Sequence, residues 1–421
     1  WDEWSEWIAA QNDNLPDIEN LAEFIDNPPP LADCLIEGIL RKGHKMMISG
    51  PSKAGKSYLL IELAIAIAEK KTWLGWQCAA GSVLYINLEL DRSSCYHRIR
   101  DVYKAMGIQA EHANRIDIWN LRGNSMPMDK LAPKLIRRAL KKQYTAVIVD
   151  PIYKVITGSE NEADQMSRFC NLFDQIATEL KCAVIYCHHH SKGFQFGKQA
   201  QDRAAGSGVF ARDADTLLDI IQLEIDEDRR SQIVETVGCD KLAQILTRRH
   251  PEWTMKICPG QTVTKEMLAN FAADYWDSEE IIPEIQIAEN QLANCTAWRV
   301  SGILREFGGF QPKNCVFCYP LHLLDSTDVL NGAPEFGTRM MRSGKWGGGK
   351  KTKEESKSRT EKNIDQTKEA VEFLAADGEV TVKRLAEYLR LSERRTRSRL
   401  EKSGYKINRG AVCDACDVSD V

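Results

Sequence analysis

The stretch that most constrains this chain is GPSKAGKS, residues 50–57. It fits G-x-x-x-x-G-K-[ST], a pattern in which a glycine-rich turn binds phosphate groups between a strand and a helix. The preceding residues 45–49, KMMIS, predict a short buried strand. Residues 58–68, YLLIELAIAIA, are rich in strong helix formers. The sequence therefore supplies both neighbours that a phosphate-binding loop requires.

Each part of this loop has a predicted chemical role. The glycines let the backbone curl so that its N–H groups point at phosphate oxygens, and the helix N-terminus adds partial positive charge. We expect Lys56 to bridge the terminal phosphates and Ser57 to bind Mg²⁺ through its hydroxyl. The expected ligands are therefore ATP and Mg²⁺. The nucleotide is predicted to contact Gly50, Pro51, Ser52, Lys53, Ala54, Gly55, Lys56, Ser57 and Tyr58.

Composition limits the class of protein. A chain of 421 residues is long enough for two or three domains, and its net charge of −4 excludes a uniformly basic nucleic-acid binder. Thirteen scattered cysteines, an odd number, favour reduced thiols over a disulfide framework. No apolar run approaches the roughly 18 residues of a membrane span, and the acidic start lacks the layout of a signal peptide. We therefore expect a cytoplasmic protein without a membrane partner.

Strands and helices alternate regularly after the loop. This alternation predicts an α/β fold, a twisted and mostly parallel sheet covered by helices. Later apolar stretches are expected to extend the sheet, the last two in antiparallel pairing. The predicted strands are 82–88, 116–120, 144–150, 182–187, 215–223, 298–307 and 314–324, and the predicted helices are 93–106, 129–142 and 161–180.

Polar residues stand at the carboxyl ends of these strands, where such sheets carry their chemistry. Asp150 follows four apolar residues and is expected to reach the Mg²⁺ shell. Glu89 is the candidate general base for in-line attack by water, although Asp91 is close enough to leave the choice open. One or two imidazoles of His188 to His190 could reach the γ-phosphate and relay the nucleotide state. A metal-binding role for this histidine run is the alternative.

Residues 191–208 form a polar, glycine-containing and net basic stretch that also holds two phenylalanines. Cations beside aromatic rings suit a loop that grips the phosphate backbone of single-stranded DNA and stacks on its bases. The expected contacts are Lys192, Lys198 and Arg203. A merely solvated loop is the alternative reading of this composition.

The chain is predicted to contain several parts. Residues 1–30 are an acidic arm that ends in three prolines, and 31–340 form the P-loop domain. An acidic, helix-rich stretch at about 224–296 interrupts that domain as an insertion. Residues 341–362 are a flexible basic linker, and 363–412 have the helix, helix and wing layout of a winged helix-turn-helix.

The second helix of this C-terminal segment is strongly basic. In a winged helix-turn-helix this helix enters the major groove of duplex DNA. A protein-contact role, or a basic face that is only solvated, is the alternative. The predicted duplex contacts are Arg394, Arg395, Arg397 and Arg399.

The order GPSKAGKS, LYINLE, VIVD, CHHHSKG and GSGVFARDADTLLDI resembles the RecA-like ATPase core of hexameric replicative helicases over residues 31–325. The likeness is nearest to the plasmid RepA type and its AAA_25-like relatives from mobile elements, and the DnaB type is more distant. The resemblance implies that Glu89 is the catalytic base and that His188 and His189 are the phosphate sensor.

The resemblance also implies an arginine that acts on the nucleotide of a neighbouring subunit. The equivalent of the DnaB-type residue is Arg305, near the turn of the last hairpin. The position near which RepA-type proteins carry this arginine holds Asp215, so Arg203 and Arg212 are alternatives. Such a residue requires a homo-oligomer, because its guanidinium must neutralise charge across an interface.

Three functions fit these features. The leading prediction is an ATP-driven hexameric ring motor that moves on single-stranded DNA, a replicative helicase of a plasmid, phage or integrative element. The second is a RecA-like recombinase or helicase loader. The third is a DNA-binding regulator in which nucleotide gates assembly without unwinding.

Overall fold

The computed structural model describes residues 18–156, 162–190, 200–203, 208–258 and 261–336 of the main part of the chain. In the C-terminal part it describes 364, 367–368, 370–371, 374–375, 380–389, 391, 393–408 and 411–414. The chain divides into two compact units, residues 1–338 and 339–421. Within the described residues, no helix combines the length and apolar character needed to cross a bilayer.

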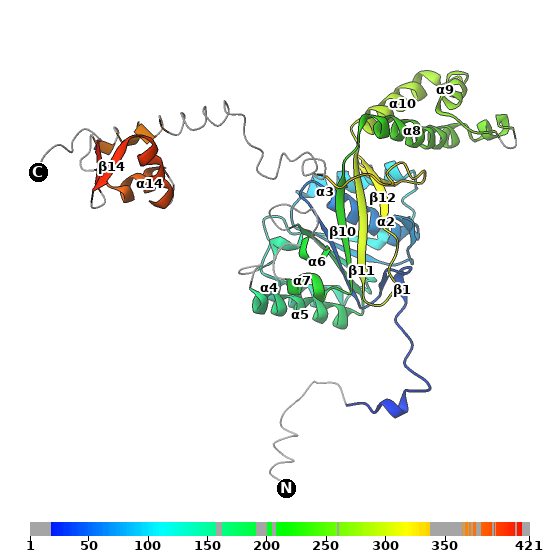
Figure 1. The fold of residues 1–421 in the computed structure, drawn as a ribbon. Coiled ribbons are helices and arrows are strands. Elements are labelled where there is room, and N and C mark those ends of the chain that lie inside the picture. The colour runs from blue at the N-terminus through cyan, green and yellow to red at the C-terminus, as the bar shows by residue number, and fades with distance from the viewer. Residues whose placement is uncertain are drawn as a thin grey trace, which may run out of the picture. The chain divides into compact units, whose positions relative to one another are not determined.

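The first unit is built on a nine-stranded sheet in the order β13-β12-β11-β10-β3-β9-β8-β6-β7 (Figure 1). Strands from β10 to β7 in this order are parallel neighbours, whereas β10, β11, β12 and β13 pair antiparallel. The predicted mostly parallel sheet is confirmed. The strands are β3 (Lys45–Gly50), β6 (Val83–Asn87), β7 (Ile116–Asn120), β8 (Ala146–Asp150), β9 (Ala183–His189), β10 (Thr216–Leu223), β11 (Thr296–Leu304), β12 (Lys313–Cys318) and β13 (Leu321–Leu324).

Helices cover both faces of this sheet, which explains why its central strands are apolar along their whole length. Successive side chains of β9 point to opposite faces of the sheet. Ile185 packs into one hydrophobic core and Tyr186 packs into a second one. The core with Ile185 includes α2 (Lys56–Glu69) and α3 (Arg92–Met106). The core with Tyr186 includes α4 (Met128–Ala139), α5 (Ala163–Leu180) and α7 (Gly208–Asp213).

Short elements complete the first unit. They are the two-stranded pairs β1 (Cys34–Ile36) with β2 (Leu40–Arg41) and β4 (Thr72–Trp73) with β5 (Trp76–Gln77), the 3-10 helices η1 (Leu21–Glu23), η2 (Ala113–Arg115), η3 (Ile152–Lys154) and η4 (Pro251–Lys256), and α6 (Ala200–Arg203).

The last predicted strand, residues 314–324, is wrong as a single element. The structure divides it into β12 and β13, which form a hairpin with Cys318 opposite Leu321. The two residues between them, Tyr319 and Pro320, make the turn. Proline has no N–H to donate to a strand ladder, so it stands where the pairing stops.

Three helices lie in the stretch between β10 and β11, where an insertion is predicted. They are α8 (Glu227–Arg249), α9 (Lys265–Ala273) and α10 (Ser278–Ala293), and they enclose an apolar cluster of their own. Figure 1 shows them grouped beyond one end of β10 and β11. The chain enters α8 from the carboxyl end of β10, which is parallel to β3. The three helices therefore lie at the sheet edge where β3 ends in the glycine-rich loop.

Arg203 does not lie where the sequence prediction placed it. The carboxylate of Asp219, in the middle of β10, is fully buried. One of its oxygens lies 2.7 Å from Nε2 of His190, and the other accepts a hydrogen bond of 2.7 Å from Nε of Arg203. The Arg203 side chain is itself buried. A DNA contact by Arg203 does not fit this placement, because its guanidinium is held inside the protein by a carboxylate.

The described part of the C-terminal unit includes two helices that are followed by a hairpin. The helices are α13 (Val382–Leu389) and α14 (Glu393–Lys402), and the hairpin pairs β14 (Tyr405–Asn408) with β15 (Ala411–Asp414). Leu385 and Leu400 are fully buried in its small core. Arg395 and Arg397 are exposed and Arg399 is half-buried, whereas the Arg394 side chain lies outside the described residues. The winged-helix assignment and the duplex contacts stay predictions.

Replacing Arg203 by alanine should destabilise the fold. Arg203→Ala leaves the buried Asp219 carboxylate without its guanidinium partner, so we expect the free energy of unfolding to fall by about 3–5 kcal/mol. The exposed Arg168 of α5 offers a control, and Arg168→Ala should change stability by less than about 0.5 kcal/mol. Urea unfolding followed by circular dichroism compares the two. Equal stability of both variants would contradict the buried ion pair.

Candidate active site

The glycine-rich loop connects β3 to α2 at the carboxyl edge of the sheet. Gly50 is the last residue of β3, and α2 begins at Lys56. Gly55, directly before the helix, has a φ of 74°, a left-handed conformation that glycine adopts without steric cost. A Cβ at this position would also stand only 3.0 Å from the ring of His322. The second glycine of the motif is therefore required by backbone conformation and by the space available.

The ammonium group of Lys56 lies across the loop. Its Nζ donates hydrogen bonds to the carbonyls of Gly50 at 2.9 Å and Pro51 at 2.8 Å, and it lies 3.2 Å from Nδ1 of His189. The side chain is buried, and this burial lowers the pKa of Lys56. A buried cation at the start of a helix, held only by neutral groups, favours the approach of an anion such as phosphate.

Asp150 receives donors from three elements. Its carboxylate accepts a hydrogen bond of 3.2 Å from the Ser57 hydroxyl of α2 and one of 2.5 Å from the Tyr85 hydroxyl of β6. The Cys187 thiol of β9 lies 3.2 Å away. Burial raises the pKa of Asp150. The sequence did not predict that Tyr85 and Cys187 belong to the site. The one feature that could have indicated it is that each places a polar atom in an otherwise apolar strand.

The Ser57 and Asp150 oxygens form a donor set that fits Mg²⁺. This ion prefers oxygen ligands and typically takes one or two from the protein, with water and phosphate completing its shell. The hydroxyl and the carboxylate approach each other at the first turn of α2, beside the glycine-rich loop. A bound cation there would also favour the ionised form of Asp150, against the effect of burial.

Glu89 stands on a tight turn directly after β6, with its side chain exposed. The turn is fixed by the buried amide of Asn87, whose oxygen accepts from Leu90 N–H at 2.9 Å and whose nitrogen donates to the Leu90 carbonyl at 2.8 Å. The Glu89 carboxylate is near enough to contribute to raising the pKa of Asp150. It thus lies at the same edge as the phosphate loop, in a position suited to a general base.

Asp91, the other candidate base, has a structural role. Its carboxylate accepts a hydrogen bond of 2.9 Å from the backbone N–H of Ser94 and caps the N-terminus of α3. Hydrogen bonding by Ser94, first through its side chain and then through its backbone N–H, lowers the pKa of Asp91. A carboxylate engaged as a helix cap is less available to activate water, so the geometry favours Glu89.

The three consecutive histidines point to three different environments. His188 is buried and its ring packs edge-on against Phe210 at 5.3 Å. His189 lies beside Lys56 and is 3.4 Å from the Ser52 hydroxyl of the loop. Its pKa is lowered, first by burial and then by the charge of Lys56. Of the predicted sensor pair, His189 contacts the phosphate loop through Ser52 and Lys56.

The third histidine, His190, belongs to the Asp219 network described above. A metal role for this histidine run finds no support in the described part of the chain, which contains no group of three or more His, Cys, Asp or Glu side chains suited to a metal.

Arg305 lies far from its own subunit's phosphate loop. It follows β11, and its Nη1 is 2.7 Å from the Asp215 carboxylate, next to the amino end of β10. The register places this end beside Met46, at the start of β3. An action of Arg305 on nucleotide can therefore only concern a neighbouring subunit, and this role stays a prediction. Lys192 and Lys198 lie outside the described residues.

The β12–β13 hairpin covers the first turns of α2. The buried Glu62 of α2 accepts from the backbone N–H of His322 at 3.0 Å and lies 2.7 Å from Nδ1 of its ring. Phe317 and Tyr319 pack on Tyr58 with ring centroids 5.5 and 5.3 Å apart. The Tyr58 side chain is consequently buried. Local sequence patterns do not predict the packing of this hairpin on α2, because contacting residues such as Glu62 and His322 are 260 positions apart.

One family model matches the chain, AAA_25, described as an AAA domain, over residues 12–195. Two solved structures are similar in fold to a limited degree. The first is an ATPase domain that is 11% identical, with 70% of this chain and 92% of that chain covered and a TM-score of 0.38. The second, a KaiC-like protein from the hyperthermophilic archaeon Pyrococcus horikoshii OT3, is 12% identical, with 67% and 88% covered and a TM-score of 0.37.

Both TM-scores are below 0.5, so the sheet order and the phosphate loop carry the fold assignment. The AAA_25 match spans the elements that position Lys56, Glu89, Asp150 and His189. Over residues 12–195, this chain is therefore similar to the AAA domains that the AAA_25 model describes.

Proposed function

We propose that this protein is a Mg²⁺-dependent ATPase that forms a ring and moves along single-stranded DNA, as the replicative helicase of a mobile element. The observation that carries the proposal is the convergence of Lys56, the Ser57–Asp150 pair and Glu89 at one edge of the sheet. These are the groups that phosphoryl transfer to water requires, namely a cation for the phosphates, oxygen ligands for the metal and a base.

In the proposed reaction, the loop N–H groups and Lys56 hold the terminal phosphates of ATP. Ser57 and Asp150 would hold the metal, which neutralises charge on the phosphates when it is bound. Glu89 accepts a proton from the attacking water, and its position depends on the turn that Asn87 fixes. Proton acceptance by a positioned carboxylate contributes about 10²- to 10⁴-fold to the rate of such a step.

His189 supports a link between nucleotide and DNA. It touches the loop through Lys56 and Ser52, and it is the last residue of β9, close before the basic stretch at 191–208. A phosphate that draws Lys56 toward itself changes the environment of His189. This change is the proposed signal from nucleotide to the DNA-contacting residues, among which Lys192 and Lys198 remain the candidates.

Ring formation and the choice of DNA are supported by the resemblance to hexameric helicases. A finger role of Arg305 requires a neighbouring subunit. The exposed arginines of α14 support a second, duplex-binding surface in the C-terminal unit.

The protein should unwind a forked DNA duplex when ATP and Mg²⁺ are present. Lys56→Ala removes the phosphate-bridging cation, and we expect its ATP turnover and unwinding to fall by at least about 10²-fold. Strand separation and phosphate release are measured together. Lys130→Ala, at an exposed position of α4, serves as the control. Tight single-strand binding without unwinding would instead favour a recombinase or loader, and normal turnover of Lys56→Ala would contradict the site.

Glu89 and Asp91 can be separated by isosteric substitutions. Glu89→Gln should lower kcat by about 10²- to 10⁴-fold with ATP binding retained, because it removes the proton acceptor. Asp91→Asn keeps a good helix cap and should stay within about twofold of the native rate. Steady-state ATP hydrolysis and nucleotide titration measure both. The reverse pattern would make Asp91 the base.

The basic helix α14 should bind duplex DNA through phosphate contacts. Replacing Arg395 and Arg397 together by alanine is expected to weaken duplex binding and to reduce the slope of log K against log salt by about 1.8. Fluorescence anisotropy at several salt concentrations measures this slope. The ATP turnover is the internal control and should not change. Duplex binding with an unaltered salt slope would remove these residues from the DNA surface.

A further inference from the structure

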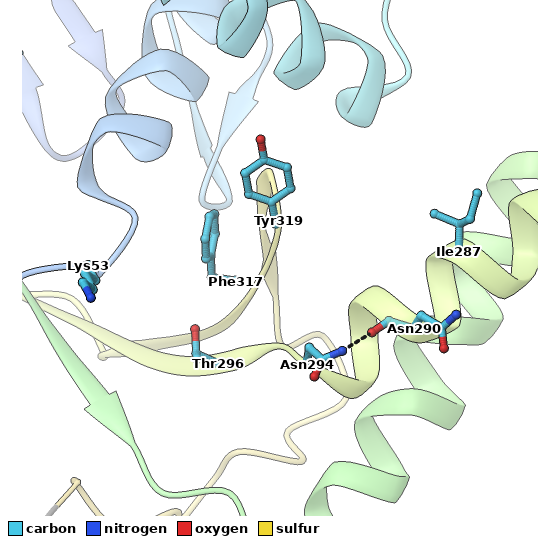
Figure 2. Close-up of a pocket in the computed structure, with 7 residues that line it drawn as sticks. All are labelled: Lys53, Ile287, Asn290, Asn294, Thr296, Phe317 and Tyr319. Atoms are coloured by element: carbon cyan, nitrogen blue, oxygen red, sulfur yellow. Dashed lines mark hydrogen bonds between the residues drawn. The ribbon is translucent and has the colours of Figure 1, made fainter. Parts of the chain in front are cut away.

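A cavity of about 580 Å³ opens between the phosphate loop, the β12–β13 hairpin and helix α10 of the insertion (Figure 2). Its volume lies in the range of about 300–1,000 Å³ that is usual for small-molecule sites. Lys53 of the loop GPSKAGKS lines one side, and Ile287, on α10, lines the opposite side. Residues from three separate segments of the chain therefore meet around one space.

The hairpin supplies aromatic rings to this cavity. Phe317 and Tyr319 both line it, and Figure 2 shows both projecting from the hairpin between Lys53 and α10. Tyr319 rests edge-on against Tyr58, with ring centroids 5.3 Å apart, and 53% of Tyr319 is exposed. A braced but accessible aromatic ring is suited to stacking on the flat face of a base.

Helix α10 and its C-cap residue supply two amides. Asn290 and Asn294 are one helical turn apart, and both line the cavity. Nδ2 of Asn294 donates a hydrogen bond of 2.9 Å to the backbone carbonyl of Asn290. This bond fixes the Asn294 side chain and leaves its amide oxygen and its second amide N–H available. A carboxamide offers a donor and an acceptor side by side. It matches the N6 donor and N7 acceptor of adenine, whereas the O6 and N7 atoms of guanine are both acceptors.

The location connects this cavity to the phosphate loop. Lys53 belongs to that loop, three residues before Lys56. The nucleoside of a nucleotide is covalently attached to its phosphates, so a nucleotide bound by the loop must place its base in space next to the loop. The cavity is the adjacent space with aromatic and amide walls.

We propose that this cavity holds the base of a nucleoside triphosphate, with Tyr319 stacking on the ring and Asn290 and Asn294 selecting adenine over guanine. The insertion is then a specificity element of the nucleotide site. This inference rests on the proposed function, because it takes the phosphates to be bound by the loop.

The test is calorimetric titration of the full chain with ATP, GTP and inorganic tripolyphosphate in the presence of Mg²⁺. The native protein should bind ATP more tightly than GTP. Replacing Asn290 and Asn294 together by alanine should raise the Kd for ATP about tenfold and leave the Kd for GTP within about twofold. Tyr319→Ala should weaken both nucleotides by about tenfold, because stacking does not distinguish bases. Tripolyphosphate should bind all variants equally.

Asn270→Ala is the matched control, since Asn270 is an exposed asparagine of α9 in the same insertion that does not line the cavity. Equal native affinities for ATP and GTP, or an unchanged ratio in the double variant, overturn the inference while the proposed function stands. A native protein that binds neither ATP nor tripolyphosphate overturns the proposed function and the inference together. Loss of tripolyphosphate binding in the double variant would show damage to the loop and would also contradict a base-reading role.

Discussion

The site depends on one buried carboxylate. Asp150 is almost completely buried, so water solvates its charge poorly and donors from the protein must stabilise it. Ser57, Tyr85 and Cys187 provide them from α2, β6 and β9. These contacts hold the first turn of the loop helix against the ends of two strands. The loop, the metal-binding oxygens and the Glu89 turn consequently keep one geometry relative to each other.

Parallel pairing makes this convergence possible. In the register of the sheet, Asn87 is level with Asp150, and Gly50 is level with His189. Residues that end neighbouring strands are therefore neighbours in space, although 139 positions separate Gly50 from His189 in sequence. The insertion joins the same edge because β10 runs parallel to β3. Its helix α10 and the last hairpin thus reach the loop, and together they complete a cavity.

Local patterns predicted the features that depend on local chemistry. The loop, the parallel strands and Asp150 could be read because each lies at a strand end with a recognisable flank. The position of Arg203 could not be predicted, because its partner is a single buried aspartate within an apolar strand. From composition alone, Arg203 belongs to a basic loop. The sequence does not distinguish Asp91 from Glu89 as the base, because both are carboxylates that closely follow the same strand. The hydrogen bond from Ser94 N–H identifies Asp91 as a helix cap. The cover of Tyr58 by Tyr319 depends on distant packing, which no local pattern contains.

The Asp219 network has a mechanical consequence. His190 and Arg203 stand on either side of residues 191–202, and both are bound to the same carboxylate. The carboxylate therefore joins the end of β9 and helix α6 to the middle of β10, so three elements that are separate in sequence share one buried charge. Because the backbone N–H of His190 also donates to the carbonyl of Gly50, a change at Asp219 would reach the first glycine of the phosphate loop.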